Sequence, residues 1–387
     1  MTDRSDRGDR SDRGDRAELT NLKRVVVKVG SALLTNVDKG LARDKIAAYC
    51  AQIDELMKQG IEVVLVSSGA VAEGCARLGW SRRPDTVHEL QTAAAVGQMG
   101  LVGAYEEVLS AHGRHTAMVM LTHDDLANRE RYLNARATLT ELLKLGVVPV
   151  INENDTVATD EIRFGDNDTL GALVANLLAA DLLVILTDVE GLMDADPRLQ
   201  PDASVILRAV ANDPGLDQFP SNETGALGRG GMVSKLRAAR LAARSGAHTV
   251  IASGHQERVL NRIVQSEPIG TLLVAELTPM TARKRWIAGQ LRAKGDLVVD
   301  AGAARALQQQ GVSLLAVGLT GVRGEFLRGD VVRCVDAAGN VVAQGLVNYA
   351  SADASRLIGL RFEDFAEHID FVGEPELIHR DNLVVLD

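Results

Sequence analysis

Short runs of β-branched and other apolar residues alternate with helix-length amphipathic segments through residues 25–252. The first run spans residues 25–30, and residues 41–59 then carry apolar side chains at helical spacing before Gly60 ends the pattern. Further strand-type runs lie at 61–66, 116–121, 147–151, 182–187 and 249–252, with helix-length segments such as 89–112 and 124–145 between them. This alternation predicts an α/β fold with a mostly parallel sheet covered on both faces. In such a sheet, ligands bind beyond the carboxyl ends of the strands.

The composition is that of a globular protein with room for two domains. The chain has 387 residues, of which 46% are apolar and 24% charged. It has neither a run of about 18 apolar residues, as a membrane span needs, nor a signal peptide, so we expect a cytoplasmic protein. Three cysteines without paired spacing argue against a disulfide framework or a structural zinc site. The net charge of −10 argues against non-specific nucleic-acid binding.

Both ends of the chain differ in texture from the α/β part. The hexapeptide SDRGDR occurs twice in residues 5–16, and we expect residues 1–21 to form a solvated, disordered tail. Residues 22–277 would form the α/β domain. From residue 281 to 387, short strand-type runs with glycine-rich joints predict a small β-rich domain. These runs are 297–299, 314–317, 331–335 and 341–343.

Lys28 interrupts an apolar run that otherwise reads as a strand buried on both faces. A lysine in a central strand needs a negative partner, because an unpaired buried ammonium group costs several kcal/mol. The alternative is that this strand lies at an exposed edge of the sheet.

Polar and glycine residues follow several strands, where the fold places its ligand site. The Ser67-Ser68-Gly69-Ala70 turn leads into a helical pattern, so it predicts either an anion site or a plain helix cap. Polar residues also end the runs at 152–155 and 187–188. Asp166 and Asp168 flank Asn167 at another helix start, where one acid would suffice as a cap; two acids are suited to organise lysines or a magnesium ion.

A glycine-rich segment, GRGGMVSK at residues 228–235, leads into a further helical pattern. Paired glycines let a backbone approach phosphate closely, and Lys235 would neutralise phosphate charge. The sequence contains no Walker A loop, no dinucleotide-binding fingerprint and no nucleophile elbow. Its eight histidines show no metal-ligand spacing.

These motifs, in this order, resemble the glutamate 5-kinase family of the amino acid kinase superfamily, over residues 22–380. The motifs are VVVKVGSALLT, VLVSSGAVAEG, ERYLNARATL, VVPVINENDTVAT, FGDND, LTDVEGL and GGMVSK. The resemblance implies a three-layer amino acid kinase fold. It also implies transfer of the ATP γ-phosphoryl group to the side-chain carboxylate of L-glutamate, the first step of proline biosynthesis. Residues 281–387 resemble a PUA domain, a small β-barrel-like module.

The resemblance also implies roles for individual residues. Lys28 and Lys235 would neutralise the transferring phosphoryl group, and Asp168 would hold both lysines. The glutamate-binding positions would be Ser68, Asp155 and Asn167. The ATP-binding positions would be Lys28, Thr187, Asp188, Arg229, Gly230, Gly231, Met232, Val233, Ser234 and Lys235. Magnesium would arrive with ATP, with Asp166 as an indirect ligand.

The family resemblance further implies a homo-oligomer, a dimer or a tetramer, with feedback inhibition by proline near the glutamate site. We expect the PUA-like part to have a structural or regulatory role rather than to bind RNA, because it carries no basic surface. Two other functions stay open. One is a related kinase acting on aspartate, N-acetylglutamate or carbamate, and the other is an RNA-binding regulator with an inactive kinase-like domain.

Overall fold

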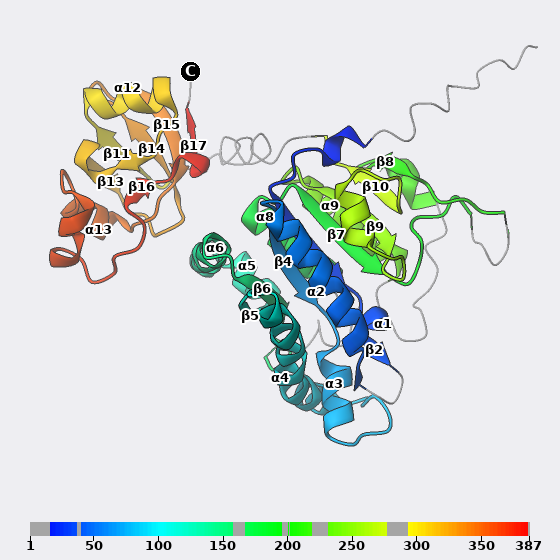
Figure 1. Cartoon of the computed structure of the whole chain (residues 1–387). Coiled ribbons are helices and arrows are strands. Elements are labelled where there is room, and N and C mark those ends of the chain that lie inside the picture. Colours follow the sequence, from blue (N-terminus) through cyan, green and yellow to red (C-terminus); the bar gives the residue numbers. More distant parts are fainter. Residues whose placement is uncertain are drawn as a thin grey trace, which may run out of the picture. The chain divides into compact units, whose positions relative to one another are not determined.

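The computed structural model describes residues 16–36, 40–157, 167–195, 200, 202–218, 231–276 and 293–385 (Figure 1). The chain divides into two compact units. The first comprises residues 1–126 with 136–279, and the second comprises residues 127–135 with 280–387. Among the described helices, none is long and apolar enough to cross a membrane.

The first unit is built on an eight-stranded sheet, and the prediction of a mostly parallel sheet is confirmed. Every neighbouring pair is parallel except β9 with β10. The strands appear as apolar runs in the sequence because most of them are buried on both faces. In spatial order they are β5 (Thr116–Leu121), β6 (Val148–Glu153), β4 (Glu62–Ser67), β1 (Arg24–Val29), β7 (Leu182–Thr187), β9 (His248–Ser253), β10 (Thr271–Val274) and β8 (Arg208–Val210).

Helices cover both faces of this sheet, which gives three layers. On one face, a single core joins alternate residues of β1, such as Val25 and Val27, to α2 (Arg43–Lys58), α4 (Val87–Ala111) and α10 (Val259–Val264). On the other face, α8 (Asn167–Leu178) contacts β1, and α9 (Met232–Ala243) contacts β9.

The remaining helices in the described residues up to 276 are short, apart from α6. They are η2 (Ala17–Leu19), α1 (Ser31–Leu34), α3 (Ala70–Arg77), α5 (His123–Ala127), α6 (Arg129–Lys144) and η3 (Pro214–Gln218). A small ribbon pairs β2 (Thr35–Asn36) with β3 (Gly40–Leu41). The single helix expected over residues 124–145 is divided at Asn128 into α5 and α6.

The folded chain begins before residue 22, so the expected boundary of the tail is wrong for residues 16–21. The Arg16 guanidinium donates hydrogen bonds to the backbone oxygens of Ile269 (2.7 Å), Gly270 (2.9 Å) and Leu207 (3.1 Å). Leu19 is 1% exposed and belongs to the core. Burial lowers the pKa of Arg16 to about 10. Three backbone acceptors and the buried Leu19 hold this segment in place. These contacts were not predicted, because Arg16 belongs to the repeated Asp and Arg residues that are typical of a solvated tail.

The second unit has its own sheet and core, as expected from its short strands. Its main sheet has the order β13 (Leu319–Gly324), β11 (Gly295–Val299), β14 (Val331–Val335), β15 (Val341–Leu346) and β17 (Leu383–Val385). A second sheet pairs β12 (Leu314–Leu315) with β16 (Glu376–Ile378). The helices are α12 (Ala301–Gln310), η4 (Ala316–Gly318), α13 (Ser351–Arg356), η5 (Phe362–Glu367) and η6 (Arg380–Asn382).

The strand expected over residues 314–317 ends at Leu315, and a 3-10 turn follows. At Gly318, which ends this turn, a Cβ atom would lie 2.6 Å from the Cβ atom of Ala303, so the chain packs closely against α12 there. The backbone N–H of Asp300 donates to the Gly318 oxygen at 3.0 Å. These tertiary contacts override the β propensity of the apolar run.

Candidate active site

Four neighbouring parallel strands, β6, β4, β1 and β7, end at the same edge of the sheet, and five of the candidate residues lie at or just after these strand ends. Lys28 lies near the end of β1, Ser68 follows β4, and Thr187 ends β7. The remaining candidates come from the first turns of α8 and α9 and from the turn after β6. The fold therefore collects residues that are up to about 200 positions apart in the sequence at one edge.

Lys28 lies on a central strand and has the negative partner that the sequence requires. Strand β1 is flanked by β4 and β7, so the alternative of an exposed edge strand is wrong. The Lys28 side chain is 8% exposed, and its Nζ lies 2.5 Å from Oδ1 of Asp168. Gly171 of α8 faces the lysine stem, where a Cβ atom would make an ordinary van der Waals contact with the Lys28 Cβ at 3.5 Å.

A second lysine reaches the other oxygen of the same carboxylate. Lys235 Nζ lies 3.1 Å from Oδ2 of Asp168, and the Ser234 hydroxyl donates to this Oδ2 at 2.8 Å. Both residues lie in the first turn of α9, which begins after Gly231. Asp168 lies in the first turn of α8, so two helix starts and one strand end meet at a single buried carboxylate.

The electrostatics of this cluster keep the carboxylate ionised. Burial alone would raise the pKa of Asp168, but the ammonium groups of Lys28 and Lys235 and the Ser234 hydroxyl hold that pKa well below its usual value. Burial lowers the pKa of Lys235, while the negative charge of Asp168 opposes this change. Two positive charges and one negative charge leave a net charge of +1 in a buried position.

Asn167 connects the ends of β4 and β6 through its side-chain amide. Its Nδ2 donates to the Ser67 backbone oxygen (3.1 Å), to Ser68 Oγ (3.0 Å) and to Asn152 Oδ1 (3.1 Å). Asn152 in turn donates from Nδ2 to Oε1 of Gln98 on α4, at 2.9 Å. The structure therefore brings two of the three expected substrate positions, Ser68 and Asn167, into direct contact.

Asp155, the third expected substrate position, lies in the turn that follows β6. Its backbone is at the same sheet edge as Ser68, because β6 and β4 are parallel neighbours.

Gly69 adopts a φ of 109° between Ser68 and α3, a left-handed conformation that glycine tolerates. The expected strand-turn-helix arrangement at residues 67–70 is confirmed.

The residues expected to bind ATP are only partly described. Thr187 and Asp188 follow β7, with the Thr187 hydroxyl 3.1 Å from Oδ1 of Asp188. Gly231 caps α9, and Met232 is its first residue. Arg229, Gly230 and Asp166 lie outside the described residues.

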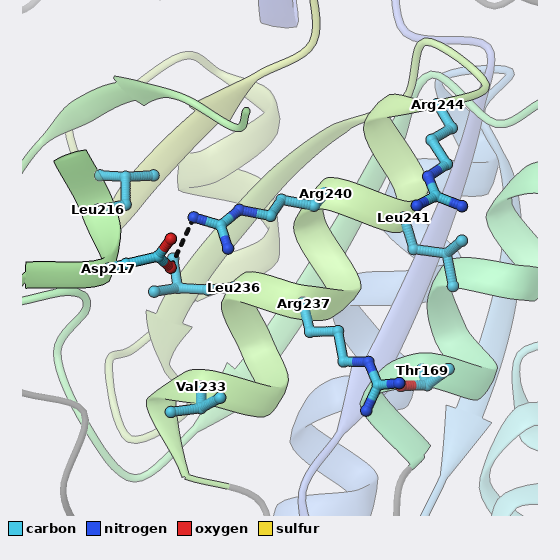
Figure 2. A pocket seen from close by; sticks show the side chains of 9 residues that line it. All are labelled: Thr169, Leu216, Asp217, Val233, Leu236, Arg237, Arg240, Leu241 and Arg244. Carbon is cyan, nitrogen blue, oxygen red and sulfur yellow. Dashed lines mark ion pairs between the residues drawn. The ribbon is translucent and has the colours of Figure 1, made fainter. Parts of the chain in front are cut away.

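A separate cavity of about 500 Å³ lies on the other side of α9. Figure 2 shows Arg237, Arg240 and Arg244 along this side, with Arg240 paired to Asp217 at 2.8 Å. Helical periodicity places Lys235 on the opposite face of α9, so the cavity is distinct from the lysine–aspartate cluster. The other lining residues are Thr169, Leu216, Val233, Leu236 and Leu241. Because Val233 lines this cavity, its side chain faces away from Lys235.

Gln98 and the contact of Ser234 with Asp168 were not predicted from the sequence. A signal for Gln98 exists: the buried stripe Leu90, Ala94, Leu101 and Tyr105 on α4 has a glutamine at the intervening helical position. No comparable signal marks Ser234, because its partner is 66 residues away in the sequence. Among the described residues, no cluster of three or more His, Cys, Asp or Glu side chains is arranged to hold a metal ion.

Three comparisons relate this chain to known proteins. The crystal structure of a UMP kinase from Bacillus anthracis aligns with a TM-score of 0.46 and 17% identity, over 66% of this chain and 97% of that chain. Residues 23–253 match the amino acid kinase family, and residues 295–369 match the PUA domain. Glutamate 5-kinase of Chromohalobacter salexigens is 61% identical over 368 residues, which cover 95% of this chain and 97% of that protein. Glutamate 5-kinase of Thioalkalivibrio sulfidiphilus is 59% identical over 369 residues, which cover 95% of this chain and 98% of that protein. The chain therefore belongs to the amino acid kinase family and, within it, to the glutamate 5-kinases.

Proposed function

We propose that this protein transfers the γ-phosphoryl group of ATP to the side-chain carboxylate of L-glutamate. The product would be L-glutamyl 5-phosphate, and the reaction would be the first step of proline biosynthesis. The observation that carries the proposal is the buried cluster in which Asp168 holds Lys28 and Lys235 at the carboxyl edge of the sheet. Its net positive charge suits this reaction, because the γ-phosphoryl group and the attacking carboxylate are both negatively charged and repel each other.

The acceptor needs no general base. A glutamate side chain has a pKa of about 4.3 and is ionised at neutral pH, so its oxygen is already a nucleophile. Attack on the γ-phosphorus would form one P–O bond, break the bond to the β-phosphate oxygen and release ADP. The protein must then align the two reactants and neutralise the equatorial oxygens of the transferring group. Lys28 and Lys235 would supply this neutralisation, and Asp168 would keep both ammonium groups in place.

Hydrogen-bond polarity supports the assignment of Ser68 and Asn167 to glutamate. Ser68 Oγ accepts from Asn167, which leaves the Ser68 hydroxyl hydrogen free for a substrate carboxylate. We propose that Asp155 pairs with the α-ammonium group of the substrate. Ser68, at the end of one strand, would then donate to a substrate carboxylate. Asp155, after the end of the neighbouring strand, would bind the substrate ammonium group.

ATP would lie along the other strand ends. Thr187, Asp188 and residues 229–235 are the proposed contacts, with the backbone around Gly230 and Gly231 approaching the phosphates. Mg²⁺ would be held chiefly by the phosphate oxygens, which is how this ion usually binds in kinases. Asp168 is unsuited as its ligand because both carboxylate oxygens face ammonium groups. Asp166 is the proposed indirect ligand.

Family membership supports two proposals about regulation and assembly. We propose a homo-oligomer, a dimer or a tetramer, that is inhibited by proline near the glutamate site. The PUA domain would have a structural or regulatory role without RNA, since residues 281–387 carry no net positive charge. Because the proposed reaction consumes ATP, we also propose that the enzyme works in the cytoplasm.

The test is ADP release with Mg-ATP and separate acids: L-glutamate, L-aspartate, N-acetyl-L-glutamate and carbamate. Hydroxylamine in the assay traps an acyl phosphate as a stable hydroxamate. We expect ADP release that depends on L-glutamate, with the γ-hydroxamate as product. Turnover with another acid alone would assign a different amino acid kinase activity, and turnover with none would favour an RNA-binding role for the PUA domain.

A further inference from the structure

Gln98 is a buried polar residue on the face of α4 that packs into the first unit. It is 4% exposed, and its neighbours on the same helical stripe are Ala94, Leu101 and Tyr105. Its Oε1 accepts a hydrogen bond from Asn152, whereas its Nε2 is buried without a partner among the described residues. An unpaired buried donor is costly, so packing and stability do not explain a glutamine at this position.

One backbone carbonyl fixes the orientation of three side-chain amides in a row. The Ser67 backbone oxygen can only accept, so the Asn167 atom that faces it at 3.1 Å must be Nδ2. This nitrogen also faces Asn152, whose contacting atom must therefore be Oδ1. Asn152 then has Nδ2 for Gln98, which must present its Oε1. Each amide orientation in this row requires the next one.

The same row determines what Asn167 offers to a ligand. Its two Nδ2 hydrogens face three acceptors within the protein, so no donor remains for a ligand. The remaining polar atom is Oδ1, which accepts. An acceptor suits an ammonium group and disfavours a second carboxylate.

We propose that Gln98 is a positioning residue of the glutamate site, which holds Asn152 and thereby secures the third of the three acceptors that fix Asn167 with its oxygen available to the substrate ammonium group. This inference rests on the proposed function. Without the Gln98 acceptor, the buried Nδ2 of Asn152 has no partner, and Asn152 no longer holds its Oδ1 firmly against Asn167. Asn167 would keep its contacts with Ser67 and Ser68 but would be held less rigidly, and glutamate would lose a preorganised contact.

The experiment compares Gln98→Met with the wild-type protein in steady-state kinetics. Methionine keeps the length of the side chain and removes the acceptor. We expect the KM for glutamate to rise about tenfold, which is the equivalent of one hydrogen bond to a charged group, with kcat and the KM for ATP within about twofold of wild type. Gln98→Glu keeps an acceptor oxygen whether it is ionised or protonated, and its KM for glutamate should stay within about threefold of wild type.

Gln52→Met is the matched control. Gln52 is also a buried glutamine, 7% exposed, and it bonds the backbone of Ala48 and Leu260 on the layer formed by α2 and α10. The same substitution there removes buried hydrogen bonds away from the site and should leave the KM for glutamate unchanged.

The outcomes separate this inference from the proposed function. Absence of glutamate-dependent ADP release by the wild-type protein would overturn the proposed function. Glutamate turnover with an unchanged KM in Gln98→Met would overturn the role of Gln98 alone. An equal rise of both KM values in Gln98→Met, or a rise in Gln98→Glu as large as in Gln98→Met, would also overturn it, because either result indicates general damage to the site.

Discussion

A single carboxylate organises the charged part of the candidate site. Each oxygen of Asp168 faces a different ammonium group, and the Ser234 hydroxyl fixes one of these oxygens. Without this carboxylate, Lys28 and Lys235 would repel each other in a buried place where charges are weakly screened. With it, both lysines stay charged and one positive charge remains in excess. In the proposed reaction, this preorganised charge would bind the phosphoryl group.

Asp155 is expected to act on substrate binding rather than on turnover. Asp155→Ala should raise the KM for glutamate roughly tenfold to a hundredfold, as expected for one lost hydrogen bond to a charged group. Initial rates at saturating ATP and variable glutamate measure this effect, with Asp202→Ala as an exposed control. A change confined to the KM for ATP would show that the assignment of Asp155 is wrong.

The depressed pKa of Lys235 predicts the alkaline limb of the pH profile. An exposed lysine has a pKa of about 10.4, and burial lowers the pKa of Lys235. Its ammonium group therefore loses its proton at a lower pH than an exposed lysine, and phosphate neutralisation is lost as pH rises through that value. We expect kcat/KM for ATP, which reports groups of the free enzyme, to fall with a midpoint below about 10.4. A profile that stays flat through that pH in brief assays would contradict the prediction.

At the scale of elements, α3 and α4 pack so closely that glycines are required between them. A Cβ atom at Gly97 would lie 1.8 Å from the Ala70 backbone oxygen, and one at Gly74 would lie 1.7 Å from the Ala93 oxygen. This contact places Gln98 on α4 relative to the Ser68 turn that precedes α3. The helix pair thus positions part of the proposed substrate site.

Gly97→Ala should force the two helices apart and lower both stability and glutamate affinity. Overpacking of this kind typically costs about 1–3 kcal/mol of unfolding free energy. Gly103→Ala on the same helix is the matched control, because a Cβ atom there meets nothing within 4 Å, and it should stabilise the protein by about 0.5–1 kcal/mol. Urea unfolding and the KM for glutamate are the measurements. Equal stability of the two variants would contradict the packing argument.

The sequence predicted elements well where apolar patterns are long and buried. The expected run at residues 182–187 is β7, and the helix expected after residue 41 is α2 with its stop at Gly60. Short elements determined by tertiary contacts were not predicted: β10 pairs antiparallel to β9, and η4 replaces the end of an expected strand. A local sequence pattern carries no information on the tertiary packing that determines these elements.

At the scale of the molecule, every described candidate residue belongs to the first unit, which has its own core. Removal of residues 281–387 should therefore leave glutamate turnover within a few-fold of the full-length protein. Glutamate saturation curves with and without proline test this, after circular dichroism has confirmed folding. Loss of turnover in a folded variant would show that the PUA domain contributes to catalysis. Loss of proline inhibition alone would assign it a regulatory role.

The sequence also indicated many residues of the candidate site, but not the contacts between them. The position of Lys28 in an apolar run predicted a negative partner. Several acids follow strands, however, and no feature of the local sequence selects Asp168 among them. The charge state of the cluster depends on Lys235, which is 207 positions after Lys28. Family resemblance supplied this pairing, and geometry now gives its physical basis. Gln98 was not predicted as a site residue because a polar residue in a helix is usually exposed, and its burial is known only from the structure.

In the proposed reaction, the two lysines held by Asp168 neutralise the transferring phosphoryl group. The most direct measurement is kcat for glutamyl hydroxamate formation in Lys28→Ala and Lys235→Ala, with Lys144→Ala as an exposed control. Loss of one preorganised charge contact should lower turnover by ~2–4 kcal/mol of transition-state stabilisation, roughly 30-fold to 1,000-fold, and leave the control unchanged. Turnover within threefold of wild type in either folded lysine variant would contradict the claim.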